Sequence, residues 1–219
     1  MTSNERGLIV FGIGDFAELA NFYISEMGIK VSAFTLHKDY IDLKTFLGKP
    51  IIAFEEIETT HPPEYYNMFS AIGYKKRNSV KKQIFSMIKS KGYQTISYIS
   101  PKANVCLKTT EIGENCFIFG DVTIEPFSKI GNNVTIWSGS SIAHHSTIGD
   151  HCFLAPKVAI AGRVTVGESC FFGVNSTVRD SIKIADNSII GAGAVILHDT
   201  QPNRIYKSLS TPPLLSNPS

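Results

Sequence analysis

Apolar side chains recur at every sixth residue from Ile112 to Ile196. All fifteen positions on this spacing are apolar, and the register never changes. A small or β-branched residue stands two places before nearly every one of them. Neither the 3.6-residue period of a helix nor the two-residue period of an amphipathic strand produces this pattern, whereas a short fixed repeat is typical of a solenoid. The sequence therefore predicts a stack of hexapeptide repeats.

A second period of 18 residues lies over the first one. A glycine follows the large apolar residue at every third repeat, at Gly113, Gly131, Gly149 and Gly167. Three hexads therefore form one coil of a triangular prism of parallel strands, and the prism is about 24 Å tall if its coils, about five in number, are about 4.8 Å apart. Parallel crossovers are normally right-handed, but uninterrupted hexads of this kind resemble the left-handed parallel β-helix.

Residues 7–100 alternate between strand and helix patterns. We expect strands over residues 8–11, 31–36, 51–54, 68–74 and 94–99, and helices over residues 16–27 and 79–91. Asn78 is expected to cap the second helix, whose buried face would carry Val80, Ile84, Met87 and Ile88. The alternation predicts a small parallel α/β domain over residues 1–100. A β-helix domain over residues 101–200 and a C-terminal tail over residues 201–219 would follow.

The first strand ends in a glycine turn that opens a helix. Gly12, Gly14 and Ala17 match the G-x-G-x-x-G/A pattern, in which glycines allow close approach of a pyrophosphate and the helix N-terminus favours its charge. The acidic residue that a dinucleotide site requires about twenty residues later is represented only by Asp39. A nucleotide diphosphate is therefore favoured over NAD, and a purely structural tight turn is the third alternative. Gly73 follows another strand at the same expected edge, and Lys75, Lys76 and Arg77 would either neutralise phosphate or form a solvated surface run.

Composition limits the kinds of partner and the cellular location that we expect for the protein. The formal net charge of +2 gives no reason to expect nucleic acid or a membrane surface as a partner. The longest apolar run near the N-terminus is too short to span a membrane, so the cytoplasm is the expected location. Cys116, Cys152 and Cys170 fall on one column inside the prism, where reduced buried thiols are the simplest interpretation. Because there is no C-x-x-C pair, we expect no metal site.

One hexad breaks the repeat with chemically useful side chains. His144 and His145 follow Ile142, and Gly162 stands one coil above His144, which leaves space beside the imidazole. A single surface histidine usually has no function, but two adjacent ones under a glycine are a candidate acid–base site. A flat prism face has no cleft of its own, so a pocket there requires a neighbouring subunit, and such prisms commonly pack as homotrimers.

An α/β half joined to uninterrupted hexads resembles the bacterial nucleotide-sugar acetyltransferases of the PglD/NeuD kind, including the VioB-like branch. The resemblance covers about residues 7–200. It is carried by the glycine turn 12–17 and by the segments 136–150, 159–162, 170–178 and 190–194.

The resemblance implies acetyl-CoA as cosubstrate, bound in a groove between two prisms, and no metal. His144 would act as general base with His145 beside it, and the backbone amides of Gly162 and Ala192 would contact the cosubstrate. The diphosphate of a UDP- or dTDP-linked sugar would bind at the first domain, through Gly12, Gly14, Asp15, Phe16 and Gly73. The expected reaction is N-acetylation of an amino-deoxy sugar such as a 4-amino-4,6-dideoxy sugar, for lipopolysaccharide, O-antigen or another surface glycan.

Two positions depart from the family pattern. The acid that often follows the base and orients it is His145 here, so Asp121, Glu125 or Asp150 would have to substitute. The histidine nine residues after the base is Phe153, with His151 expected on a neighbouring corner, which leaves a backbone N–H as the expected oxyanion donor. Two other functions remain open: O-acyl transfer with the same fold and base, and a non-catalytic nucleotide-binding scaffold.

Overall fold

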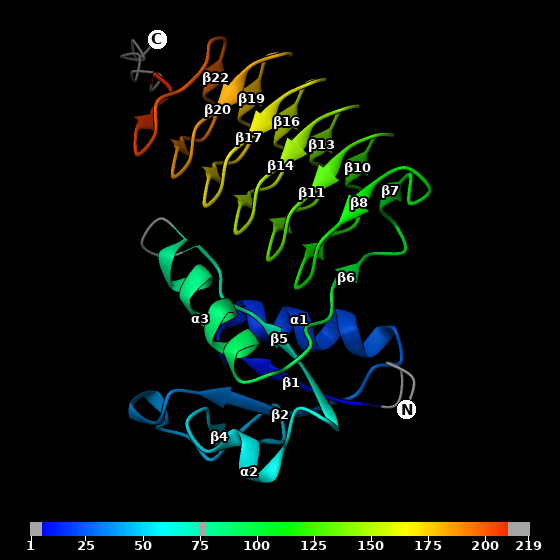
Figure 1. Ribbon diagram of the computed structural model, residues 1–219, viewed down its shortest axis with the longest axis vertical. Helices are drawn as coiled ribbons and strands as arrows, with labels where there is room; N and C mark the ends of the chain where they lie inside the picture. The colour runs from blue at the N-terminus through cyan, green and yellow to red at the C-terminus, as the bar shows by residue number, and fades with distance from the viewer. Residues whose placement is uncertain (1–5, 75–77, 210–219) are drawn as a thin grey trace, which may run out of the picture.

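The computed structural model describes residues 6–74 and 78–209. The predicted lysine and arginine run at 75–77 and the end of the predicted tail, residues 210–219, lie outside the described residues. In the described part the chain forms an α/β unit followed by a three-faced prism of short parallel strands, with the α/β unit at one end of the prism (Figure 1). The predicted fold class is confirmed.

The α/β unit contains one sheet with strand order β3-β4-β2-β1-β5. All neighbouring strands are parallel except the short β3, which pairs antiparallel with β4. Helix α1 packs on one face of the sheet, while α2 and α3 pack on the other. The elements are β1 Gly7–Phe11, α1 Asp15–Glu26, β2 Val31–Leu36, the 3₁₀ turn η1 Lys38–Tyr40, β3 Thr45–Phe46, β4 Lys49–Ala53, α2 Ile57–Thr60, β5 Tyr66–Ser70 and α3 Ser79–Ser90.

Two strand predictions in this unit need correction. The strand expected over 68–74 runs over Tyr66–Ser70 instead, because Ala71 N–H makes the last sheet bond, to Phe11 O. The strand expected over 94–99 does not join this sheet as a full strand, since Thr95 makes only a single bridge to Met68. The chain then crosses to the prism, where β6 Tyr98–Ile99 pairs with β9.

The prism has one seven-strand, one six-strand and one five-strand face. The seven-strand face contains β6, β9 Phe117–Ile118, β12 Thr135–Ile136, β15 Phe153–Leu154, β18 Phe171–Phe172, β21 Ile189–Ile190 and β23 Ile205–Tyr206. The six-strand face contains β7 Asn104–Val105, β10 Thr123–Ile124, β13 Ser141–Ile142, β16 Ala159–Ile160, β19 Thr177–Val178 and β22 Val195–Ile196. The five-strand face contains β8 Glu111–Ile112, β11 Lys129–Ile130, β14 Thr147–Ile148, β17 Thr165–Val166 and β20 Lys183–Ile184.

The six-residue period appears as inward columns of side chains. The large aliphatic residues pair with their equivalents 18 residues away, for example Ile124 with Ile142, and they fill the prism as one buried cluster. The three cysteines predicted on one column are buried, and all four cysteines of the chain are free thiols. Burial of this continuous apolar column is the main driving force for stacking the coils.

The 18-residue glycine period has a steric cause. A Cβ on Gly149 would lie 2.6 Å from the backbone carbon of Gly167 in the next coil, and one on Gly113 would lie 2.7 Å from that of Gly131. Backbones of successive coils therefore touch at the corner between the five-strand and seven-strand faces. Only glycine permits this approach.

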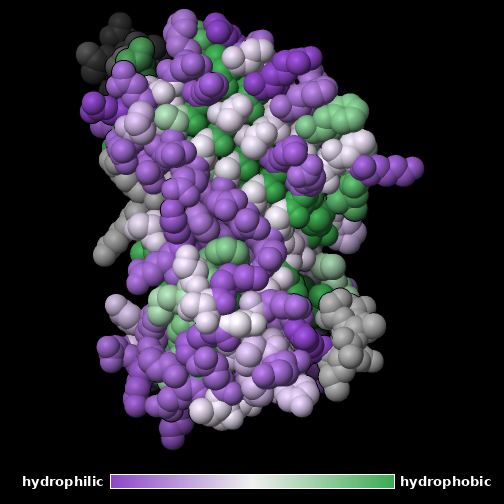
Figure 2. All heavy atoms as spheres, viewed as in Figure 1, coloured by the Kyte–Doolittle hydropathy of each residue, from purple (hydrophilic) through white to green (hydrophobic). Residues whose placement is uncertain are grey.

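The α/β unit and the prism share an aromatic core. Phe16 packs against Phe117 with ring centroids 5.4 Å apart, and Trp137 stacks on Phe119 at 4.1 Å. Elsewhere the prism exposes apolar side chains, including Phe127, Val174, Val195 and Leu197. Figure 2 shows hydrophobic side chains along one side of the prism and polar side chains over most of the α/β unit.

Candidate active site

The paired histidines lie at the corner between the six-strand and five-strand faces, directly after β13. Strand pairing places His144 two residues beyond Ile142 and Gly162 two residues beyond Ile160, so the predicted column is confirmed. His145 occupies the left-handed corner position with φ of 60°. Such corners usually suit Asn, Asp, His or Gly, which explains how a histidine is tolerated here.

The two imidazoles contact one another. Nδ1 of His144 lies 3.1 Å from Nδ1 of His145, and the rings are nearly perpendicular. Only one of these two nitrogens carries the hydrogen, because two N–H groups or two lone pairs would repel. His145 is held in turn by the ring of Phe127, 4.9 Å away between centroids. Phe127 was not singled out from the sequence, where it looks like any other exposed corner residue.

Gly162 supports the His144 ring. A Cβ built on Gly162 would lie 2.8 Å from Cε1 and 3.0 Å from Nε2 of His144. The imidazole therefore packs against the glycine, which confirms the predicted space beside the ring and shows that the ring fills it. His144 Nε2 makes no hydrogen bond to any residue that the structure describes, and the side chain is exposed to solvent.

The candidate acids fall in different places. Glu125 lies at the site, where its Oε2 accepts a 2.8 Å hydrogen bond from the backbone N–H of His144. Asp150 is engaged with Asn132 at the next corner, accepting from its backbone N–H at 2.7 Å. Glu125 therefore holds the backbone of the histidine pair, and His145 is the group that contacts the His144 ring.

The two amides expected to contact the cosubstrate lie apart within one chain. Gly162 is at the corner after the six-strand face, whereas Ala192 follows β21 at the corner after the seven-strand face. Neither N–H donates to a protein acceptor in the described part of the chain. Both are therefore available to a ligand, but one chain does not bring them together.

Phe153 and His151 are both remote from the His144 corner. Phe153 lies on the seven-strand face and packs against Phe171, with ring centroids 5.8 Å apart. His151 is buried at the corner between the five-strand and seven-strand faces. Neither contacts His144 or His145 in this chain.

The glycine turn lies at the carboxyl ends of β1, β2 and β5. Gly12 has φ of 122° and donates its N–H to Thr35 O at 3.0 Å. Gly14 occupies the N-cap position of α1, and its carbonyl accepts hydrogen bonds from the first turn of the helix. Asp15 is exposed at the helix start. Gly73 lies half-buried with open space around its Cα, three residues after the end of the neighbouring strand β5.

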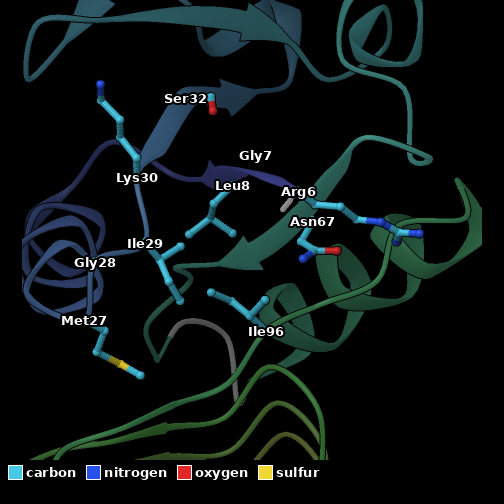
Figure 3. Close-up of a pocket in the computed structure, with 10 residues that line it drawn as sticks. All are labelled: Arg6, Gly7, Leu8, Met27, Gly28, Ile29, Lys30, Ser32, Asn67 and Ile96. Carbon is cyan, nitrogen blue, oxygen red and sulfur yellow. The ribbon is translucent and has the colours of Figure 1, made fainter. Parts of the chain in front are cut away.

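A cavity of about 380 Å³ lies at the opposite, amino ends of the strands (Figure 3). Leu8, Ile29 and Ile96 form its apolar part, with Asn67 on one side and Lys30 on the other. None of the predicted site residues lines it. Among residues 6–74 and 78–209 no group of three metal-ligating side chains comes together, and none of the helices found there is long and apolar enough to cross a membrane.

Two family models match the prism. The model described as bacterial transferase hexapeptide (six repeats) matches residues 109–144 and 127–162, and the hexapeptide repeat of succinyl-transferase matches residues 163–198. The two models together match residues 109–198, and the chain has a left-handed parallel β-helix of these repeats joined to an α/β unit. The protein is therefore classed as an acyltransferase built on hexapeptide repeats.

Solved structures narrow the comparison. A mutant of perosamine N-acetyltransferase from Caulobacter crescentus, in complex with CoA and GDP-perosamine, is 26% identical with a TM-score of 0.83, and the match covers 92% of this chain and 93% of that one. The acetyltransferase domain of PglB from Neisseria gonorrhoeae is 20% identical, with a TM-score of 0.82 and coverage of 95% and 100%. WeeI from Acinetobacter baumannii is 20% identical, with a TM-score of 0.77 and coverage of 90% and 93%. The last two likenesses concern the fold alone. No curated protein matches the sequence.

Proposed function

We propose that the protein transfers the acetyl group of acetyl-CoA to the amino group of a nucleotide-linked amino-deoxy sugar, with His144 as general base. The observation that carries the proposal is the set of contacts that the His144 ring makes. Its ring packs against Gly162, its Nδ1 is held by His145, and its Nε2 is left to interact with a substrate. The 26% identical perosamine N-acetyltransferase, solved with CoA and GDP-perosamine, supports this class of substrates.

The reaction follows from the chemistry of amines and thioesters. The amine nitrogen attacks the thioester carbonyl carbon, so that a C–N bond forms and the C–S bond breaks. His144 Nε2 takes a proton from the attacking amine, and the proton leaves with the CoA sulfur as a thiol. A positioned base of this kind contributes about 10²- to 10⁴-fold to the rate.

His145 fixes the tautomer of His144. To accept a proton at Nε2, neutral His144 must carry its hydrogen on Nδ1, and His145 Nδ1 then accepts that hydrogen bond. The same bond persists when His144 becomes an imidazolium. His145 therefore fulfils the orienting role that an acid would otherwise have, while Glu125 fixes the backbone. Both histidines belong to the proposed catalytic site.

The cosubstrate and the sugar nucleotide require different surfaces. Because Gly162 and Ala192 lie at different corners, a groove that uses both amides needs a second prism, and we propose the homotrimer that supplies it. The nucleotide diphosphate would bind at the glycine turn and Gly73, where the N-terminus of α1 favours negative charge. We propose a UDP-, dTDP- or GDP-linked 4-amino-4,6-dideoxy sugar as acceptor, for surface glycan synthesis in the cytoplasm, whose reducing conditions suit the four free thiols.

The test is a substrate panel. The protein is incubated with acetyl-CoA and each of a set of UDP-, dTDP- and GDP-linked amino sugars, while free thiol is followed and products are weighed by mass spectrometry. The expected result is thiol release with one sugar class and a product that survives mild alkali, because amides resist it and esters do not. Thiol release in which every product is cleaved by alkali would assign O-acylation instead. A light-scattering mass of one chain, 24.0 kDa, would refute the shared groove.

A further inference from the structure

Helix α3 meets the prism along a column of four polar corner residues, here named the corner ladder: Asn115, Asn133, His151 and Ser169. They are spaced by 18 residues and share the left-handed backbone conformation, with φ between 55° and 62°. All four are buried, which is unusual for polar corners of a prism. Buried polar groups are costly unless they are hydrogen-bonded, so their bonds describe what the column does.

The orientation of the first rung is fixed by the backbone. Ser70 N–H donates to Asn115 Oδ1 at 2.8 Å, so the amide oxygen of Asn115 must point toward β5. Its Nδ2 then donates to Ser70 O at 3.3 Å and to Asn133 Oδ1 at 2.8 Å. Because an N–H can only donate, neither amide can be flipped without losing bonds.

The orientation of the Asn133 amide in turn determines which hydrogen-bonding role His151 Nδ1 has. Asn133 Nδ2 donates to Lys81 O in α3 at 3.1 Å and faces His151 Nδ1 at 3.0 Å. His151 Nδ1 must therefore be an acceptor, so the ring is neutral and carries its hydrogen on Nε2. Protonation would place two donors opposite each other in a buried site.

The surroundings of His151 also favour the neutral ring. Phe85 of α3 contacts its edge, with ring centroids 5.7 Å apart. The charged groups that face it are Asp150 and Glu168 from the prism and Lys81 and Lys82 from α3. Glu168 is paired with Lys82 at 2.8 Å. Burial is the main cause that lowers the pKa of His151 from its ordinary value, and the two carboxylates oppose this only in part.

The ladder holds both flanks of the segment that contains Gly73. On the strand side, Asn115 bonds both backbone groups of Ser70, the last residue of β5. On the helix side, Asn133 bonds Lys81 O, and Asn78 Nδ2 donates to Cys170 O at 3.0 Å. The ladder thus bonds the carboxyl end of β5 and the start of α3 to the prism, and the bonds of Asn78 to Cys170 O and of Lys81 Nζ to Thr135 Oγ1 add to it on the helix side.

We propose that Asn115, Asn133 and His151 are positioning residues that hold the carboxyl end of β5 on the prism, and that they do so only while His151 is neutral. That this end of β5 binds the sugar nucleotide rests on the proposed function. When acid protonates His151 and breaks the corner ladder, a smaller fraction of the protein is in the binding-competent arrangement. The apparent affinity for the sugar nucleotide then falls in proportion to that fraction.

The decisive variant is His151→Asn. Asparagine already occupies two rungs of the ladder, tolerates the left-handed corner, and offers an Oδ1 acceptor that does not titrate. We expect the KM of the wild type for the sugar nucleotide to rise about fivefold or more between pH 7.5 and 5.5, relative to His151→Asn measured in the same buffers. At pH 7.5 the two proteins should agree within about twofold. Equal acid-side rises of KM in both proteins would overturn the proposal.

Two readouts do not depend on activity. Nitrogen NMR of imidazole-labelled protein should show His151 neutral with its hydrogen on Nε2 at pH 7, and a hydrogen on Nδ1 would overturn the ladder. Thermal melting should show the wild type losing stability relative to His151→Asn as the pH falls below 6.5, the ordinary pKa of histidine. The reason is that the unfolded chain binds a proton at this histidine more readily than the folded one. If both results hold but no nucleotide sugar is acetylated, the proposed function fails and the ladder stands.

Discussion

Substitution of Gly162 by alanine adds one carbon atom beside the His144 ring and tests whether the position of that ring controls the rate. The new Cβ would lie 2.8 Å and 3.0 Å from two ring atoms of His144, against ordinary contacts of 3.4–4 Å. The His144 ring must therefore move by about 0.5 to 1 Å, and a displacement of this size at a reacting centre costs about 10²-fold in rate. The ring is the exposed end of a side chain and can move cheaply, so the free energy of unfolding should change by less than about 0.5 kcal/mol.

The assay is thiol release with saturating sugar nucleotide and variable acetyl-CoA, together with a thermal melt. We expect kcat to fall about 10²-fold for Gly162→Ala while the melting temperature stays within about two degrees of the wild type. Gly120→Ala is the matched control, since its Cβ would meet neighbours only at 3.5 Å or more, and it should keep wild-type kcat. The backbone N–H of residue 162 is retained in the variant. A raised KM for acetyl-CoA with unchanged kcat would therefore refute the view that Gly162 seats His144.

Three further predictions address the base, its partner and a buried lysine. His144→Ala should reduce acetyl-CoA turnover by about 10²- to 10⁴-fold without loss of stability, and turnover within about tenfold of wild type would refute the assignment. His145→Asp keeps a residue that suits the left-handed corner and adds a carboxylate beside His144; because a carboxylate favours the imidazolium, the acid limb of the rate–pH profile should move to higher pH. Lys81 is buried against Thr135, and burial lowers its pKa from 10.5 to about 8, equivalent to about 3 kcal/mol against the charged form. Since the folded protein binds fewer protons at Lys81 than the unfolded chain does, wild-type stability should rise from pH 8 to 10.5. Lys81→Met should therefore be more stable than wild type at pH 7 in urea unfolding, with the difference shrinking above pH 8; a variant less stable at pH 7 would contradict this.

The prism could be predicted almost completely from the sequence, because its core repeats along a single axis and each coil contacts only its neighbours. Each inward residue meets its equivalent 18 positions away, so a single period determines the register of a pair such as Ile124 and Ile142. The same register located His144 under Gly162. The glycine period was visible too, although its cause, contact between the backbones of successive coils, required coordinates.

The junction between the α/β unit and the prism could not be predicted, because its buried hydrogen bonds join residues from 45 to 92 positions apart. Asn78 occupies the predicted N-cap position of α3, but its side chain makes no capping bond and instead donates to Cys170 O in the prism. Lys81 follows Val80, which was predicted on the buried face, yet Lys81 is the more deeply buried of the two. Helical periodicity identifies the side of a helix that faces its own sheet, and it gives no sign of a second partner on another side.

His145 stands where an acid often follows the proposed base, at a corner that an aspartate would also tolerate. Residue 145 adopts a left-handed backbone, and among the side chains that tolerate it, histidine can both pack against the Phe127 ring and offer a lone pair to His144. A carboxylate is still present, but Glu125 reaches the site from the coil below and bonds the His144 backbone. In the proposed mechanism the corner thus separates two tasks that one acid could combine: Glu125 holds the backbone of His144, and His145 accepts the hydrogen on His144 Nδ1. A neutral acceptor stabilises the imidazolium less than a carboxylate does. For that reason the rate of this enzyme should depend more on the placement of His144 against Gly162 than on electrostatic support of its charged form.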